Sequence, residues 1–179
     1  MKRFLITLFI LLLIVAIAFV GLVIWVGLNA PLKVYYDGVA VDELEKPLIA
    51  SNVKPLVFEL RDNAVYSAKV IPCKDAKVAF SVDGVPYDFF EIEDYSKCFS
   101  IVFAEHEGSV SLTVTPLSYF EGMLSLCYEE HEILISDDTD LSKVFTLVIS
   151  NGKKECTVDF GIDPDSVRGV RIYPNEVVF

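Results

Sequence analysis

Residues 145–162 read FTLVISNGKKECTVDFGI, and this stretch predicts a β-hairpin. Asn151 and Gly152 lie between two alternating runs, and this dipeptide is the strongest short-range hairpin signal because both central residues of its turn need positive φ. A two-residue turn pairs Ser150 with Lys153, Leu147 with Cys156 and Phe145 with Val158. One face then carries Phe145, Leu147, Ile149, Cys156, Val158 and Phe160. A one-residue slip would reverse every one of these placements, so the clean partition of the side chains between the two faces supports this register.

A second hairpin is predicted at Asp83-Gly84, with Phe80 facing Tyr87 and Val78 facing Phe89. Other short runs rich in β-branched and aromatic residues are 32–36, 56–61, 65–71, 77–82, 87–92, 99–103, 110–115, 133–135, 143–150, 155–162 and 170–173. Strands this short and regularly spaced are typical of a sandwich or barrel. The sequence therefore predicts a mostly β fold, an antiparallel β-sandwich that is immunoglobulin-like in general architecture.

One segment breaks the β pattern and predicts a short helix. Ser118 and Glu121 fit a capping box, in which each side chain bonds to a free backbone N–H group. Apolar residues follow at the spacing of one helix face, at Phe120, Met123, Leu124 and Cys127. The β-rich part forms one unit, or two closely packed halves that divide near residue 116.

The N-terminal residues 4–28 form an apolar run in which Thr7 is the only polar side chain. As a helix, this run is long enough to cross the ~30 Å hydrocarbon core of a bilayer. A cut after Ala18, by signal peptidase, would leave a strongly apolar new N-terminus, so an uncleaved signal anchor is expected. The predicted organisation is a cytoplasmic tail at 1–3, a transmembrane helix at 4–28 and an exported β-rich domain at 29–179. Trp25 is expected at the outer interface, where amphipathic rings are favoured.

Charge sets the expected orientation and limits the partners. The chain carries 15 basic and 26 acidic residues, and only Lys2 and Arg3 precede the apolar run. Positive charge resists translocation, so the N-terminus is expected in the cytoplasm and the rest outside the membrane. The exported part has a formal charge of 13 minus 26, or −13. This balance argues against nucleic acid as a partner.

The chain has four cysteines, Cys73, Cys98, Cys127 and Cys156, all in the part expected outside the cytoplasm, where disulfides are permitted. Cys73 and Cys98 lie almost symmetrically about the Asp83-Gly84 turn, and a bond between them would stabilise the fold by about 3 kcal/mol. Cys127 and Cys156 are both expected to point inward, so they form the second predicted pair. Four buried thiols that pack as small apolar groups are the alternative.

No metal site or cofactor is predicted. The two histidines lie in the triplets 105–107 and 130–132, each Glu-His-Glu, but neighbouring side chains of an extended segment point to opposite faces and do not converge on one ion. The acidic runs 137–140 and 163–165 lack the glycine and the terminal glutamate of the helix–loop–helix calcium loop. All four segments are expected to be solvated turns.

An anchor followed by a β-rich domain is similar in layout to the sortases, which are cysteine transpeptidases. Such chemistry needs a thiolate, a histidine and an arginine that stabilises the oxyanion. The resemblance nominates Cys127, His106 and either Arg168 or Arg171. The residues 124–128, LSLCY, depart from the TLxTC motif of that family. An immunoglobulin-type domain would place a tryptophan between two core cysteines, whereas the only tryptophan here lies in the apolar run.

The sequence thus favours a non-enzymatic binding or scaffold module, held at the outer face of a cell membrane by a single span. The expected partners are the bilayer, through residues 4–28, and an envelope protein or a cell-wall component. Exposed aromatic residues are the usual anchors of such surfaces, and the candidates are Tyr35, Tyr36, Phe90, Tyr95 and Tyr173. The alternatives are a cysteine-dependent exported enzyme, and a subunit of a membrane assembly whose interface is the span itself.

Overall fold

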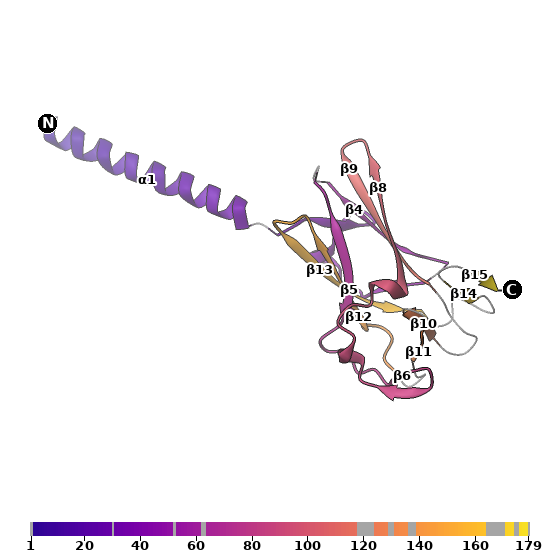
Figure 1. Cartoon of the computed structure of the whole chain (residues 1–179). Coiled ribbons are helices and arrows are strands. Elements are labelled where there is room, and N and C mark those ends of the chain that lie inside the picture. Colours follow the sequence, from indigo (N-terminus) through magenta and orange to yellow (C-terminus); the bar gives the residue numbers. More distant parts are fainter. Residues whose placement is uncertain are drawn as a thin grey trace. The chain divides into compact units, whose positions relative to one another are not determined.

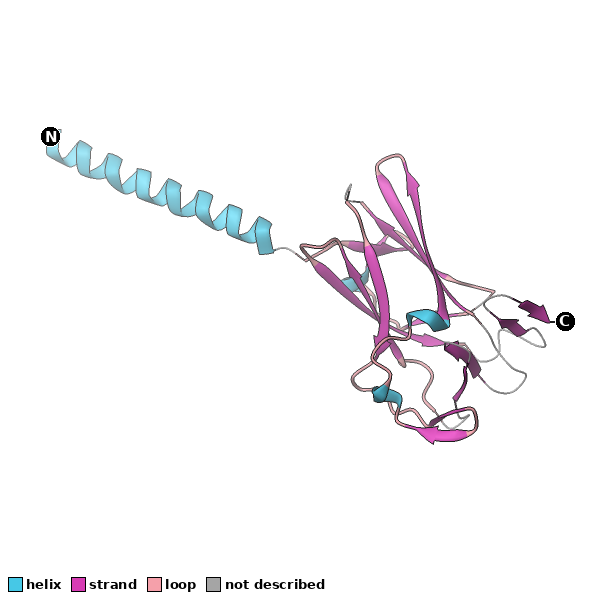
Figure 2. Cartoon of the chain, in the orientation of Figure 1, coloured by secondary structure: helices cyan, strands magenta, loops and turns pink. Residues whose placement is uncertain are grey.

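The structure is a computed structural model that describes residues 2–29, 31–51, 53–61, 64–117, 124–128, 131–135, 139–163, 171–173 and 176–178 (Figure 1). The chain divides into two compact units, Met1–Pro31 and Leu32–Phe179. The first unit contains the helix α1 (Lys2–Asn29). The second unit is built mainly of strands (Figure 2).

The helix α1 is apolar on every side where its side chains are described, which is over residues 9–25. Within the described residues, no helix is found that has both the length and the hydropathy of a membrane-crossing segment. The described helical structure of the second unit consists of single 3₁₀ turns, η1 (Val41–Glu43), η2 (Phe89–Glu91) and η3 (Ser96–Cys98).

Two sheets of the second unit share one core. The first, called sheet A, has the strand order β2-β1-β4-β9-β8. Its strands are β1 (Val34–Tyr36), β2 (Val39–Ala40), β4 (Leu56–Leu60), β8 (Phe99–His106) and β9 (Ser109–Pro116). Every neighbouring pair in this sheet is antiparallel. In β9 the residues alternate between buried and half-buried, so one face of the sheet covers the core.

The second sheet, called sheet B, has the strand order β3-β13-β12-β5. Its strands are β3 (Leu48–Ala50), β5 (Ser67–Pro72), β12 (Phe145–Ser150) and β13 (Glu155–Ile162). The β3–β13 pair is parallel, and the other pairs are antiparallel. Rings from both sheets meet in the core, where Phe99 of sheet A lies 5.2 Å from Phe145 and 5.6 Å from Phe160, measured between ring centroids.

Two insertions extend the same end of this pair of sheets. The first, residues 73–98, runs from the end of β5 to the start of β8, and the second, residues 117–144, runs from the end of β9 to the start of β12. Their described parts form sheet C, in the order β10-β11-β6-β7, with β6 (Phe80–Val82), β7 (Val85–Tyr87), β10 (Leu124–Tyr128) and β11 (His131–Ile135). We call the described residues of both insertions the cap. A separate hairpin, β14 (Arg171–Tyr173) and β15 (Glu176–Val178), follows near the C-terminus.

Tyr95 joins the cap to the sandwich core. Its side chain is fully buried, its ring stacks on Phe89 at 5.0 Å, and its hydroxyl donates to the Phe89 carbonyl at 2.7 Å. Its backbone N–H donates to the carbonyl of Val70, and the N–H of Val70 donates to the Ser96 hydroxyl. Because β5 is the outer strand of sheet B, these bonds also satisfy the N–H and C=O groups that Val70 directs away from β12.

The predicted mostly β, antiparallel fold is confirmed, and so is the apolar face of the 145–162 hairpin. Its register is not the predicted one, because Ser150 pairs with Glu155 and Ile149 with Cys156. The loop has four residues, 151–154, in which the Asn151 side chain accepts bonds from the N–H groups of Lys153 and Lys154. The register shifts by an even number of residues, so every side chain stays on its predicted face.

At Asp83-Gly84 the prediction holds for the first pair, Phe80 with Tyr87, and both turn residues have positive φ. The pairing of Val78 with Phe89 is wrong, because β7 ends at Tyr87 and Phe89 begins η2. Asp37-Gly38 forms a third turn of this kind between β1 and β2, which the sequence analysis missed.

The helix predicted from Ser118 to Cys127 is wrong over its second half, and its first half, 118–123, lies outside the described residues. Leu124–Tyr128 forms strand β10, in which Leu124 pairs with Ile135 and Cys127 with Glu132. This short apolar segment satisfies the helical spacing and the strand alternation equally well, so periodicity alone does not decide between them. Pairing with β11 decides, since neighbouring strands override a weak local preference.

Candidate functional site

A polar network surrounds Asp159 on the outer face of sheet B. The Thr146 hydroxyl donates to Asp159 at 2.6 Å, and the Lys143 ammonium lies 2.9 Å from the same carboxylate. Lys143 also lies 3.8 Å from Asp75 in the turn that follows β5. Thr146 and Asp159 are directly opposite each other in the β12–β13 ladder. Strand alternation places both side chains on the face away from the core.

The surroundings of Asp159 favour its ionised form. Burial is the largest influence and would raise the pKa of this carboxyl, but the hydrogen bonds from Thr146, Lys143 and the Cys73 thiol together lower it. The hydrogen bond to Asp159 in turn raises the pKa of Lys143. The two groups therefore form a charge-balanced pair, and the Lys143 cation is committed to carboxylates of this chain.

Cys73 belongs to the same network. It directly follows β5, its N–H donates to the carbonyl of Val144 at 2.9 Å, and its side chain is 2% exposed. The first insertion leaves sheet B at this residue, and the second insertion re-enters the sheet just after Val144. The network therefore lies where both insertions join the sandwich.

Close backbone contact reinforces this junction at Gly161. The N–H of Ile162 donates to the carbonyl of Leu141, and the N–H of Val144 donates to the carbonyl of Phe160. A Cβ atom added at Gly161 would overlap the backbone of Leu141 and Ser142. Only glycine lets the chain before β12 lie this close to β13.

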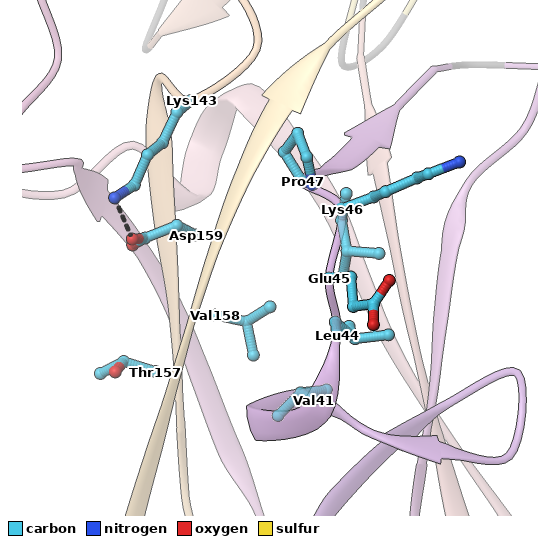
Figure 3. Close-up of a pocket in the computed structure, with 10 residues that line it drawn as sticks. Val41, Leu44, Glu45, Lys46, Pro47, Lys143, Thr157, Val158 and Asp159 are labelled. Atoms are coloured by element: carbon cyan, nitrogen blue, oxygen red, sulfur yellow. Dashed lines mark ion pairs between the residues drawn. The ribbon is translucent and has the colours of Figure 1, made fainter.

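Two hollows adjoin Asp159. One, of about 270 Å³, lies between β13 and residues 41–48, and Figure 3 shows Lys143 directed at Asp159 on one side of it and Val158 on the side that faces Val41. The other, of about 460 Å³, lies over the outer face of β5, β12 and β13 and includes Cys73 and Thr146 in its lining. Small-molecule sites are typically deep and mostly apolar, whereas the Lys143–Asp159 ion pair lines the smaller hollow, and charged side chains, Lys69, Lys74 and Asp159 among them, line the larger one. The network is best understood as the clasp that holds the cap on the sandwich.

The structure does not join the predicted cysteine pairs. Cys73 and Cys98 are both buried. Cys73 is a free thiol that is hydrogen-bonded to Asp159 on the outer face of sheet B. Cys156 is a half-buried free thiol in β13, while Cys127 lies in β10 of a different sheet. The two disulfides stay predictions, to be tested by thiol chemistry.

The residues nominated by the resemblance to sortases lie in separate places. His106 ends β8, and its Nε2 lies 3.2 Å from the Ser111 hydroxyl. Cys127 is in β10, which lies beside η3 at the opposite end of β8. The eight residues of β8 separate its ends by about 23 Å. Arg171 is in β14, and Arg168 lies outside the described residues.

The histidine and acidic segments are described only in part. The 105–107 segment lies at the β8–β9 turn, as predicted. The turn predicted at 130–132 is wrong for His131 and Glu132, which begin strand β11, and the His131 Nδ1 lies 2.7 Å from a carboxylate oxygen of Asp83. Residues 130, 137, 138, 164 and 165 lie outside the described residues. Among the described residues, no three potential metal ligands come together. Thr139 is buried and joins the insertions, since its hydroxyl contacts the N–H and the carbonyl of Ala79 at 3.3 and 3.5 Å.

The candidate aromatic anchors differ in how far they are buried. Tyr95 is core, Tyr35 and Tyr36 are half-buried, and Phe90 is exposed. The Arg61 guanidinium lies 4.0 Å from the ring centroid of Tyr35. Tyr173 is in β14, where side chains are not described, and Trp25 is exposed on α1. Sequence reasoning missed Lys143, Thr146 and Asp159, and the only signal for them was that Thr146 and Asp159 fall on the polar face of the predicted hairpin.

No family model, no curated protein and no solved structure matches this chain. Its function is therefore argued from its own residues.

Proposed function

We propose that this chain is a membrane-anchored, exported binding module without enzymatic activity. The observation that carries the proposal is α1, a helix of 28 residues whose described apolar side chains are 50–68% exposed. At ~1.5 Å per residue such a helix is about 42 Å long, which exceeds the ~30 Å core of a bilayer. A helix that is apolar all round needs an apolar environment on every side. The length of about 42 Å is that of the whole helix, Lys2–Asn29, whereas its side chains are described over residues 9–25.

The proposed orientation places Lys2 and Arg3 in the cytoplasm and the β unit outside the membrane. The acidic balance of that unit supports its solubility and opposes binding to anionic lipid or nucleic acid. The partner class that fits is a protein of the same envelope or a component of the cell wall. The β unit is the part of the chain that recognises this partner.

We propose further that the sandwich is of immunoglobulin type. The constant-type fold has strands ABED in one sheet and CFG in the other. The order β1-β4-β9-β8 matches ABED, and β13-β12-β5 matches GFC, with β3 added in parallel beside β13. The rings of Phe145, Phe99 and Phe160 occupy the core in which antibody domains carry a tryptophan and a disulfide. Such folds are scaffolds for many functions, so the fold supports a binding role without naming the ligand.

The location and the anchor are tested together. Membranes from cells that express the full chain are washed with alkaline carbonate, and protease is then added to intact cells. The proposal expects the chain to stay in the membrane pellet and its β unit to be digested from outside. A matched variant with Leu12→Lys and Val15→Lys places two charges within the span and should release the chain into the wash. Extraction of the unaltered chain, or protection of its β unit, contradicts the proposal.

A further inference from the structure

The cap lies at the end of the sandwich farthest from the point where the chain enters it. In sheet A, Val34 pairs with Leu60, so the chain enters at the end where β4 finishes. Both insertions leave and rejoin the sheets at the other end, where Leu56 pairs with Val114 and Phe99 pairs with Pro116. A module tethered at its entry end presents its opposite end to partners, and long loops on a rigid scaffold commonly carry function.

The cap exposes large apolar side chains at this end. All three residues of β7 are exposed, with Val85 at 63% and Tyr87 at 47%, and Phe90 of η2 is exposed at 47%. Single exposed apolar residues need no explanation, but a contiguous group marks an interaction site. Tyr87 and Phe90 are linked by ring contacts of Tyr87 with Phe80, Phe80 with Phe89 and Phe89 with Phe90, with centroid distances of 5.5–6.0 Å. Strand alternation places Val85 on the same face of β7 as Tyr87.

The exposed rings are held by buried neighbours. Phe89 is 2% exposed and stacks on Tyr95, which fixes the short turn that carries Phe90. The Asp88 carboxylate accepts the N–H of Phe90 at 2.9 Å and caps the same turn. The Tyr87 hydroxyl is hydrogen-bonded to the Glu91 carboxylate, which orients the ring. Aromatic side chains held in advance lose little conformational freedom on binding, which favours them as interface anchors.

The segment that carries these rings is acidic, and one of its carboxylates, Asp83, also contacts His131. Residues 78–96 contain no lysine or arginine. The acidic residues of the segment 83–94 are all exposed, and they are Asp83, Asp88, Glu91, Glu93 and Asp94. An apolar centre with a rim of carboxylates is complementary to an apolar centre with a rim of basic side chains. The same charge opposes an anionic lipid surface or a nucleic acid at this site.

The open edge of β7 is unsuited to strand addition. Val82 pairs with Val85 at the two-residue turn and Ser81 pairs with Pro86, so alternation directs the backbone of Pro86 away from β6. Proline has no N–H to offer at that edge. Recognition at this surface must therefore come from side chains, and the partner need not be an extended strand.

We propose that the exposed surface of residues 83–94 is the docking site for a cationic segment of a partner protein, one that places lysine or arginine side chains around an apolar centre. Val85, Tyr87 and Phe90 supply the apolar contact, and the five carboxylates supply the charge. This inference rests on the proposed function, because it names the partner class of the exported module.

The test uses the full chain in nanodiscs of neutral lipid and a fluorescent peptide of alternating lysine and leucine, with empty nanodiscs as the blank. We expect saturable binding that weakens as salt rises. The double variant Tyr87→Ser/Phe90→Ser should weaken the dissociation constant at least tenfold, and Glu91→Gln/Glu93→Gln several-fold. The matched control Val57→Ser/Val102→Ser alters similarly exposed residues on the outer face of sheet A and should bind as the unaltered chain does.

Two further peptides separate the contributions. A peptide of alternating glutamate and leucine, and one of alternating lysine and serine, should each bind at least tenfold more weakly. The proposal is overturned by no binding of the first peptide, by equal binding of the lysine–serine peptide, or by unchanged binding to the double variant. If the double variant unfolds, Phe90→Ser alone replaces it, because this ring is half exposed.

The preparation used for binding also shows which proposal fails. Alkaline extraction of the same membranes reports on the anchor alone. A chain that resists extraction and binds no peptide contradicts the docking site and leaves the anchored module standing. A chain that is extracted and still binds through residues 83–94 contradicts the anchor and leaves the docking site standing.

Discussion

The sandwich and the cap are built by different rules. In β9 every second residue is buried, and its neighbours in sheet A pair with it along their whole length. In β7 no residue is buried, and a single neighbour pairs with it among the described strands. The cap nevertheless adds buried side chains to the shared core, namely Phe80, Phe89, Ile133 and Ile135, and Tyr95 and the clasp at Asp159 tie it to sheet B. The regular sheets and the cap therefore share one core, while β7 stays exposed and can present side chains to partners.

The largest effect is expected from removing the ring that contacts both the two sheets and the cap. Phe145 contacts rings of the sandwich and of the cap at centroid distances of 5.2–5.7 Å, namely Phe89, Tyr95, Phe99 and Phe160. Phe145→Ala should lower the free energy of unfolding by about 3–5 kcal/mol through the cavity that it leaves. Urea unfolding of the full chain in mild detergent measures this change.

The control for Phe145→Ala is Val57→Ala on the outer face of sheet A, where the side chain is exposed. It should change the free energy of unfolding by less than about 0.5 kcal/mol. Equal effects of the two substitutions would mean that the aromatic cluster is not the shared core.

The next largest effect is expected at the junction. Gly161→Ala forces a Cβ atom against the backbone of Leu141 and Ser142, which no side-chain movement relieves. We expect a cost of about 3 kcal/mol, the upper end of the range for overpacking. Hydrogen exchange followed by mass spectrometry should show faster exchange in residues 139–144 than in β9, because the cap loosens first.

Gly152→Ala is the matched control for the junction glycine. Gly152 has a φ of +78° but nothing lies within 4 Å of the added Cβ, so the cost is conformational strain alone, about 1 kcal/mol. The exchange of residues 139–144 should not change in this variant. If both variants loosen the cap equally, the close approach at Gly161 is not what holds it.

A smaller effect is expected on the stability of the folded chain at low pH, through the carboxylate of Asp159. The pKa of Asp159 is lowered in the folded chain from about 3.9 in an unfolded one. Its contribution is therefore fully present above that value and is lost as the pH falls below about 4 and through the folded pKa. Because the side chain is 41% exposed, the contribution at neutral pH is on the order of 1 kcal/mol.

Asp159→Asn should accordingly lower the stability at pH 7 and remove part of the decline in stability as the pH falls below about 4. Thermal unfolding across this range measures the slope. Asp75→Asn alters the other carboxylate near Lys143, which is 84% exposed, and should leave both the stability and the slope close to those of the unaltered chain. An unchanged slope in Asp159→Asn would contradict the clasp.

The mostly β, antiparallel character of the fold was predictable from sequence, and the arrangement of the cap was not, for a physical reason. In a strand that is buried on one face, apolar side chains recur at every second residue. This pattern identified both strands of the hairpin at 145–162 and the face that points inward. Its register depended on the loop, because the Asn151 side chain bonds to two backbone N–H groups and lengthens the turn to four residues. Local turn chemistry of this kind outweighs the dipeptide rule.

The elements that sequence reasoning missed are short and depend on distant partners. β3 exists through its parallel pairing with β13, and β10 through its pairing with β11. The clasp at Asp159 was hidden because its members come from residues 73–75, 143–146 and 159, which only the fold brings together. Tyr95 was one of the candidate anchors, and its burial depends on insertion into the core beside Phe145.

The smallest expected effect concerns the thiols, which decide between the predicted disulfides and the buried-thiol alternative. Cys73 is 2% exposed, and Cys156 is half-buried. Burial, with a further influence from Asp42, raises the pKa of the Cys156 thiol, so its reactive thiolate is scarce at neutral pH. In the native chain a maleimide should leave Cys73 unmodified and label Cys156 slowly, at a rate that rises with pH.

The same labelling in denaturant without reductant completes the test. If Cys73 and Cys156 are free thiols, both should then react at once, and peptide mass spectrometry should find each modified. If either reacts only after reduction, it is oxidised in the native chain, and the pairing with Cys98 or Cys127 is established by the linked peptides. A Cys73–Cys98 bond would join the two ends of the first insertion. This covalent link, rather than the clasp at Asp159, would then contribute about 3 kcal/mol to the stability of the cap.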